Sequence, residues 1–224
     1  MTSTVDLGIL APEAPAQVAK FPTVPHRHAA SYCGAYLEES VRAASSIDLA
    51  AVERAAAILL KAYTSGAAVF SCGNGGSASV ANHLQCDHTK GVRTDTDLTP
   101  RVTSLSTNVE LLTAIANDLG FEQVFTYQLQ SLARSGDVLV AISSSGCSTN
   151  IINALSFARD NDIRTIALTG FTGGDLKSIA DVAIHVDCTN YGVVEDLHQA
   201  IMHSIAQFVR QSRMTPSAIA ATTF

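Results

Sequence analysis

Residues 67–77 read AAVFSCGNGGS, a short apolar run followed at once by a loop with three glycines. A helical pattern comes next, so this stretch predicts a strand, a turn and the start of a helix for which Ser77 is the N-cap. Glycines in such a turn permit backbone angles that other residues avoid, and they let a ligand approach main-chain N–H groups. A tight turn without a ligand is the alternative, but the position at the end of a strand favours a ligand site.

Four more short apolar runs follow, and helical segments separate them. Their apolarity is continuous rather than alternating, which indicates strands that are buried on both faces of a parallel sheet. The predicted fold class is therefore α/β, a doubly wound five-stranded parallel sheet flanked by helices. The five predicted strands are residues 67–72, 102–106, 138–142, 165–168 and 182–186.

The segments outside this alternation of strands and helices set the predicted domain limits. Two helices are expected before the first strand, one over residues 32–44 and one that begins with Ser46 as its N-cap and ends at Gly66. The start of the chain is rich in Ala, Pro and Thr and has no sustained period. We therefore expect a flexible arm over residues 1–28, a single domain over 29–211 and a tail over 212–224.

The composition of the 224-residue chain excludes several classes of protein. Hydrophobic residues make up 47% and charged residues only 15%, which is enough apolar material for a folded core. The formal net charge of −6 offers no basic surface for nucleic acid, and the low charge density favours a homo-oligomer. No apolar run is long enough for a membrane span and no signal-peptide pattern is present, so we expect a cytoplasmic protein. The five scattered cysteines favour free thiols over disulfides or a four-thiolate zinc site.

Residues 142–150, ISSSGCSTN, form a second candidate site after the third predicted strand. Several hydroxyls, a glycine and the start of a helix with free N–H groups together favour a cradle for a phosphate group. No lysine follows the glycine, so a nucleoside triphosphate loop does not fit and a sugar monophosphate is the favoured ligand. A serine-rich loop that only caps a helix is the alternative.

A dinucleotide site is a further alternative for the glycine loop, because Gly73, Gly75 and Ala78 match the pattern G-x-G-x-x-A. A dinucleotide-binding fold needs an acidic residue about 20 positions on, at the end of a second strand, to bind the ribose hydroxyls. Residues 92–97 occupy that window, and no apolar strand precedes them. We therefore expect no nucleotide cofactor.

His83 and Asp87 are four residues apart in the predicted helix after the glycine loop, with Asn82 and His88 beside them. That spacing places both side chains on one face of the helix. A histidine paired with a carboxylate forms half of a metal site or a proton-transfer pair. An exposed helical ion pair is the alternative, and the nearby glycine loop favours a functional role.

The last long helix carries Glu195, Asp196, His198 and His203 in the run VVEDLHQAIMHSIAQFV. Glu195 and His203 are eight residues apart, about 12 Å along an ideal helix, so one small ion does not reach both if the helix is straight. The structural alternative to a functional role is a buried core histidine for His203 and an exposed one for His198. The sequence chemistry leaves both interpretations open.

These motifs together resemble the sugar isomerase (SIS) domain family, from about residue 30 to 211 and in the same order. The segments that carry the resemblance are SCGNGGSAS, NHLQCD, LTAIANDLGFEQVF, GDVLVAISSSGCSTNII, IALTGFTGG and EDLHQAIMHSI. The resemblance implies the fold predicted above and a homotetramer with active sites between subunits.

The resemblance also implies residue roles. Asp87 would be the general base and His203 the general acid, and a divalent ion, usually zinc, would lie near four side chains. These implied metal-site residues are His83, Asp87, Glu195 and His203. The residues implied in binding a sugar phosphate are Asn74, Gly75, Ser77, Thr107, Ser143, Ser144, Ser145, Gly146 and Ser148.

Three positions depart from the better-known members of the family. Asp87 stands where they have Glu, so its carboxylate is one methylene shorter. Glu195 stands where they have Gln, which adds a charge that favours a metal cation. Thr107 stands where Asp is frequent, which changes the recognition of sugar hydroxyls.

The activity that the resemblance implies is aldose–ketose isomerisation of a sugar phosphate through an enediol. The implied substrate pair is sedoheptulose 7-phosphate and D-glycero-D-manno-heptose 7-phosphate. A non-catalytic SIS protein, which binds a sugar phosphate or associates with a replication initiator, is the alternative from another class. A different ketose-phosphate isomerase or an aminosugar-phosphate enzyme is the alternative within the fold.

Overall fold

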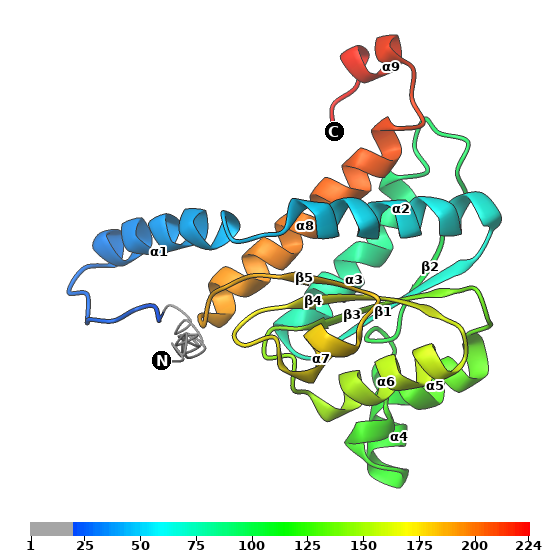
Figure 1. Ribbon diagram of the computed structural model, residues 1–224, viewed down its shortest axis with the longest axis horizontal. Coiled ribbons are helices and arrows are strands. Elements are labelled where there is room, and N and C mark those ends of the chain that lie inside the picture. The colour runs from blue at the N-terminus through cyan, green and yellow to red at the C-terminus, as the bar shows by residue number, and fades with distance from the viewer. Residues whose placement is uncertain (1–19) are drawn as a thin grey trace, which may run out of the picture.

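The computed structural model describes residues 20–224 and has a five-stranded parallel sheet between two layers of helices (Figure 1). The strand order is β2-β1-β3-β4-β5, and every neighbouring pair is parallel. Each strand lies within two residues of its predicted bounds, so the predicted fold class is confirmed. The strands are β1 (Ala68–Gly73), β2 (Arg101–Ser104), β3 (Val138–Ser143), β4 (Arg164–Thr169) and β5 (Val182–His185).

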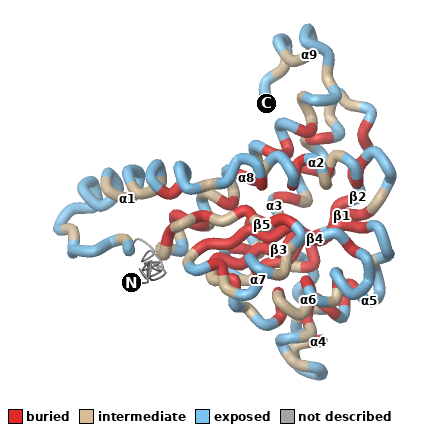
Figure 2. The backbone as a smooth tube through the Cα atoms, viewed as in Figure 1, coloured by how far each residue is buried: buried red, intermediate tan, exposed pale blue. Residues whose placement is uncertain are grey.

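One helical layer contains α2, α3 and α8, and the other contains α4, α5, α6 and α7 (Figure 1). Side chains of the central strands alternate between the two layers: Val138 and Val140 of β3 pack with the first, and Leu139 and Ala141 with the second. These strands are therefore buried on both faces, which explains their continuous apolar runs (Figure 2). The helices are α1 (Ala29–Ala44), α2 (Leu49–Ser65), α3 (Gly76–Cys86), α4 (Val109–Asp118), α5 (Thr126–Leu132), α6 (Thr149–Asp160), α7 (Gly174–Ile179), α8 (Tyr191–Gln211) and α9 (Pro216–Ala221), with the short turns η1 (Asp87–Gly91) and η2 (Phe121–Gln123).

The second N-terminal helix starts later than predicted. Asp48, rather than Ser46, is the N-cap of α2, and its carboxylate accepts a hydrogen bond from the Ala50 N–H at 2.8 Å. The Ser46 hydroxyl instead donates to a carbonyl at the end of α1, because the chain has not yet turned into α2 at that residue. Gly66 ends α2 with a left-handed φ of 76°, as predicted.

The predicted C-terminal tail, residues 212–224, contributes no strand to the sheet. Residues 1–19 of the predicted arm lie outside the described residues, and the predicted tail contains the short helix α9. Within residues 20–224, no helix combines the length and the apolarity needed to cross a membrane. All five cysteines are free thiols.

His198 is fully buried, which excludes the alternative of an exposed histidine at this position. The face of α8 that packs on the sheet includes Val194, Ile201 and Ile205, and His198 lies on that same face by its spacing. Its Nε2 lies 3.1 Å from the carbonyl oxygen of Thr169. Burial lowers the pKa of His198 to about 4, because a charged imidazolium would lose its hydration there.

We expect the free energy of unfolding to fall as the pH is lowered from about 6.5 towards 4. His198 stays neutral in the folded chain over this range and becomes charged in the unfolded chain, so the unfolded state binds the additional proton. Urea unfolding of the wild type and of His198→Gln at a series of pH values measures the effect. The slope of the variant should be shallower by up to about 1.4 kcal/mol per pH unit, and equal slopes would contradict this explanation.

Candidate active site

Strands β1 and β3 are neighbours, but the chain leaves their carboxyl ends in opposite directions, towards β2 and towards β4. In a doubly wound sheet this arrangement leaves a crevice between the two loops, where ligands bind. The loops here are the two that the sequence singled out. The side-chain amides of Asn74 and Asn150 exchange two hydrogen bonds, of 2.9 and 3.0 Å, which hold the loops together.

A hollow of about 140 Å³, here named the serine pocket, opens between these loops and the start of α8. Ser144 gives the clearest sign of a ligand, because its hydroxyl is buried and has no hydrogen-bond partner among the described residues. Buried polar groups without partners are rare in native proteins, so a bound group is expected to complete the site. The serine pocket is lined by Asn74, Ser77, Ile142, Ser143, Ser144, Ser145, Ser148, Tyr191 and Glu195.

The start of α6 offers N–H donors beside the serine pocket. Ser148 is the N-cap of α6, but its side chain does not cap the helix, and its Oγ lies 3.3 Å from the Ser143 Oγ. The Ile151 N–H of the first turn donates to the Ser148 carbonyl at 3.0 Å, and the N–H groups of Thr149 and Asn150 are left to bind an anion, which the helix dipole also favours. These features support the predicted phosphate cradle.

Ser77 lines the serine pocket, but its position in α3 differs from the predicted one. It is not the N-cap of α3, because Gly75 takes that position with a φ of 54° that suits glycine. Ser77 lies in the first turn of α3, buried and lining the pocket.

Gly146 shapes the serine loop through contact with the loop after β4. Its φ is 69°, and a Cβ at this position would overlap the carbonyl oxygen of Gly173. The Gly146 carbonyl accepts a hydrogen bond from the Leu176 N–H at 3.1 Å. Neither Gly146 nor Gly75 lines the pocket, so both predicted residues act through the backbone geometry of their loops.

His83, Asp87 and His203 form a second group, here named the His–Asp cluster. His203 Nδ1 lies 2.6 Å from Asp87 Oδ2, and His83 Nε2 lies 3.2 Å from Asp87 Oδ1. The two imidazole rings meet edge to face with centroids 4.8 Å apart. The side chain of Asp87 is 25% exposed and that of His203 is 37% exposed, which excludes the alternative of a buried core histidine at residue 203 and leaves the cluster open to a small ligand.

The His–Asp cluster has the donor set of an open zinc site. Two imidazoles, one carboxylate and a free position are typical of catalytic zinc. One ligand atom from each of His83, Asp87 and His203 lies within 4.8 Å of the other two, so the three residues fit a divalent ion.

A π-helical turn places Asp87 in this cluster. The turn η1 begins at Asp87 directly after α3, and such turns often occur at functional sites because they redirect side chains. The next residue, His88, is buried with its Nδ1 2.6 Å from the Tyr63 hydroxyl, which anchors the turn on α2. Arg210 of α8 donates to the Thr94 carbonyl at 3.0 Å and contacts the Asp95 carboxylate at 3.0 Å. The segment with Asp87 is thus held against the helix that carries His203.

Two predicted residues lie away from the His–Asp cluster. Glu195 lines the serine pocket next to Gly76, at which a Cβ would overlap the Glu195 carboxylate. Burial, and secondarily the charge of Asp196, raises the pKa of Glu195. Thr107 lies in neither place, because its hydroxyl donates to the Ser104 carbonyl at 2.9 Å and it borders a different hollow.

Three residues of the candidate site were not predicted from the sequence. Asn150 pairs with Asn74 across the two loops, and Tyr191 lines the serine pocket from the start of α8. Gln199 contacts both histidines of the His–Asp cluster. Its spacing of four residues from Glu195 and from His203 is the signal that places all three on one face of α8.

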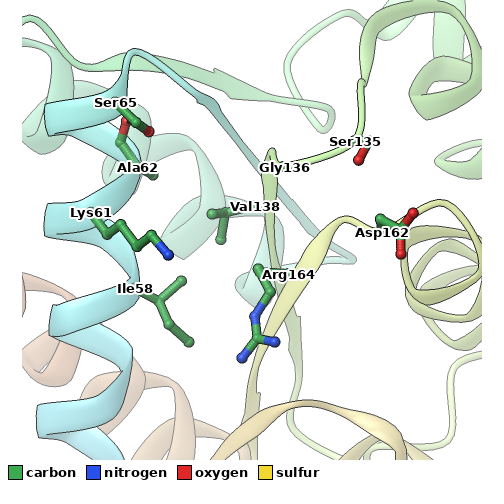
Figure 3. A pocket seen from close by; sticks show the side chains of 9 residues that line it. All are labelled: Ile58, Lys61, Ala62, Ser65, Ser135, Gly136, Val138, Asp162 and Arg164. Atoms are coloured by element: carbon green, nitrogen blue, oxygen red, sulfur yellow. The ribbon is translucent and has the colours of Figure 1, made fainter.

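A larger hollow, of about 610 Å³, lies at the other end of the strands, where β3 and β4 begin (Figure 3). Val138 and Arg164 line it at the starts of β3 and β4, together with Lys61 of α2. None of the predicted site residues lies there. Ligands of doubly wound sheets bind at the carboxyl edge, so this hollow is not the candidate active site.

Comparison with known proteins identifies the family of this chain. Residues 34–170 match the family model of the SIS domain. A phosphoheptose isomerase from Aliarcobacter butzleri is 38% identical over 158 residues, which cover 70% of this chain and 83% of that protein. One from Colwellia psychrerythraea is 35% identical over 170 residues, which cover 75% and 86%. The solved structure of a phosphoheptose isomerase from Neisseria gonorrhoeae has a TM-score of 0.75 at 34% identity, covering 81% of this chain and 98% of that one.

The chain belongs to the SIS-domain family, as its motifs indicated. Within that family it groups with the phosphoheptose isomerases, and it is an enzyme of the isomerase class.

Proposed function

We propose that this enzyme interconverts sedoheptulose 7-phosphate and D-glycero-D-manno-heptose 7-phosphate. The observation that carries the proposal is the Asp87 carboxylate held between two imidazoles, on a chain whose separate hydroxyl-lined pocket suits a phosphate. The names of the relatives support a seven-carbon sugar phosphate as the substrate class.

The reaction transfers one carbon-bound proton between neighbouring carbons of the sugar. In the proposed mechanism, Asp87 removes the proton next to the carbonyl and, after exchange with solvent, delivers a proton to the adjacent carbon of a cis-enediol. His203 donates a proton to the carbonyl oxygen as negative charge develops there, and it takes a proton from the neighbouring hydroxyl as that oxygen becomes the new carbonyl. The 2.6 Å separation of His203 Nδ1 and Asp87 Oδ2 supports this pairing of acid and base.

The serine pocket would bind the phosphate group. The Ser144, Ser145 and Ser148 hydroxyls and the start of α6 are the donors that favour a phosphate there. Contacts to this remote group would supply binding energy that holds the sugar in its reactive position.

We further propose that each active site forms between subunits of a homotetramer. Within one chain the serine pocket and the His–Asp cluster lie at Glu195 and His203, about 12 Å apart along α8. Because Glu195 lines the serine pocket, it would face the His–Asp cluster of a neighbouring copy together with that pocket. The exposed apolar side chains of Leu37 and Val41 on α1 and Phe208 on α8 support association.

The proposal includes a divalent metal, with zinc favoured by the nitrogen-rich donor set. His83, Asp87 and His203 would hold it. When bound, such an ion supplies positive charge that stabilises a developing oxyanion.

We expect Asp87→Asn and His203→Ala each to lower turnover of sedoheptulose 7-phosphate by on the order of 10²-fold or more, because each removes a proton-transfer group. Turnover is measured on a panel of five- to seven-carbon sugar phosphates. Asp160→Asn, an exposed change on α6, is the matched control. Near-native turnover in either site variant would refute its role, and a preference for a shorter sugar would refute the proposed substrate.

Metal analysis of the purified full chain tests the metal site. We expect close to one zinc per chain, lost in His83→Ala and retained in the exposed-residue control His28→Ala. Zinc titration after chelation measures the affinity directly. Equal zinc content in His83→Ala and wild type would contradict the site.

Co-expression of two inactive variants tests whether the active site is shared. If the serine pocket of one chain serves the His–Asp cluster of another, mixed oligomers of Ser145→Ala and Asp87→Asn contain some sites with neither substitution. Turnover should then recover well above that of either variant alone. If both parts come from one chain, the mixed oligomers stay as inactive as the parents.

A further inference from the structure

Tyr191 is the first residue of α8 and lines the serine pocket from outside the two loops. The residue is 60% exposed, and its hydroxyl makes no hydrogen bond with any other residue of the described range 20–224. A tyrosine hydroxyl can donate one hydrogen bond, so this one is available to a ligand in the pocket. Tyr191 has no role in the proposed mechanism.

The charge of the serine pocket makes such a donor valuable. Among residues 20–224, none of those that line the pocket is Lys, Arg or His, and Glu195 adds a negative charge. A phosphate would therefore be bound by neutral donors and by the start of α6. Two of the hydroxyls already face each other, because the Oγ atoms of Ser143 and Ser148 lie 3.3 Å apart. A free hydroxyl from α8 adds a donor that the two loops do not supply.

Phe171 holds the ring of Tyr191 beside the pocket. The two ring centroids lie 4.7 Å apart, with 52° between the ring planes. Phe171 has a φ of 52°, a left-handed conformation that is unusual for a bulky side chain and costs conformational energy. Such conformations persist where the surrounding structure imposes them, and they are frequent at ligand sites.

Hydrogen bonds connect this aromatic pair with the serine loop. The Gly170 N–H donates to the Ser144 carbonyl at 2.9 Å, and the Phe171 N–H donates to the Cys188 carbonyl at 2.9 Å. A Cβ at Gly170 would overlap a side chain of α8, so the loop after β4 packs closely between the serine loop and α8. The position of the Tyr191 ring is thus linked to the backbone that presents the unpartnered Ser144 hydroxyl.

We propose that Tyr191 is a substrate-binding residue whose hydroxyl donates a hydrogen bond to the phosphate group in the serine pocket. Phe171 is the positioning residue that keeps the tyrosine ring at the pocket. The ligand class is a phosphate monoester, and inorganic phosphate is its simplest representative. This inference rests on the proposed function of the serine pocket, to which it adds a donor from α8.

Calorimetric titration of the purified full chain with inorganic phosphate, sedoheptulose 7-phosphate and unphosphorylated sedoheptulose tests this role. Tyr191→Phe removes the hydroxyl and keeps the ring. We expect its dissociation constants for both phosphate ligands to rise about tenfold, because a hydrogen bond to a charged group is lost. The dissociation constant for sedoheptulose should not change.

Tyr127→Phe is the matched control, since Tyr127 is another exposed tyrosine and lies on α5. It should bind all three ligands like the wild type. Equal phosphate binding in Tyr191→Phe and in the wild type would overturn the proposal. A loss equally large for sedoheptulose would also overturn it, because the hydroxyl would then contact the sugar.

A double-mutant cycle tests the part of Phe171. Phe171→Leu removes the aromatic contact and should weaken phosphate binding several-fold in the wild-type background. The same substitution in Tyr191→Phe should have little further effect, because no hydroxyl is left to position. A loss of the same size in both backgrounds would show that Phe171 acts independently of the hydroxyl and would contradict its positioning role.

Steady-state kinetics and Ser145→Ala separate this inference from the proposed function. We expect Tyr191→Phe to raise KM for sedoheptulose 7-phosphate about tenfold with little change in kcat, because a binding contact is lost and both proton-transfer groups remain. If Ser145→Ala loses phosphate binding but Tyr191→Phe retains it, the phosphate pocket stands and the role of Tyr191 fails. If Tyr191→Phe weakens phosphate binding but the wild type does not turn over sedoheptulose 7-phosphate, the proposed substrate fails and the role of Tyr191 stands. If neither substitution weakens phosphate binding, both fail.

Discussion

Strands β1 and β3 are parallel neighbours, but the chain continues from β1 towards one side of the sheet and from β3 towards the other. The loops that follow them therefore diverge, and the crevice between these loops is the candidate active site. Glycines in the first loop and Gly146 in the second allow the two loops to turn directly into α3 and α6. The reciprocal amide pair of Asn74 and Asn150 closes the base of the crevice. What stays open is a small pocket lined with hydroxyls, and the buried hydroxyl of Ser144 has no hydrogen-bond partner among residues 20–224.

Helix α8 connects that pocket to the proposed chemistry. Glu195, Gln199 and His203 recur at intervals of four residues, so one face of a single helix reaches from the serine pocket to the His–Asp cluster. The opposite face is buried on the sheet through Val194, His198 and Ile201. The helix is also fixed at both ends, by the 2.6 Å hydrogen bond from the Tyr36 hydroxyl to Asp196 and by the contacts of Arg210. A rigid helix of this kind suits a reaction that depends on the placement of one carboxylate and one imidazole.

The sequence predicts the sheet and both loops because these depend on local patterns. Each apolar run, and any glycine at its end, can be recognised from its own segment of the sequence. The observed strands accordingly lie within two residues of the predicted bounds. Features that depend on contacts between distant segments were not predicted correctly. The sequence leaves open which of His198 and His203 is buried, because helical spacing does not say which face of α8 packs on the sheet. The N-caps predicted at Ser46 and Ser77 each lie two residues from the observed N-caps, Asp48 and Gly75.

The central claim is that Asp87 removes a carbon-bound proton from a sugar phosphate. The most direct measurement is incubation of the enzyme with sedoheptulose 7-phosphate in deuterated water, with the label located by NMR. The account predicts deuterium on the carbon next to the carbonyl with the wild type, and no label above background when residue 87 is asparagine. A sugar that is converted without uptake of solvent deuterium, or one that is labelled equally by both proteins, would contradict it.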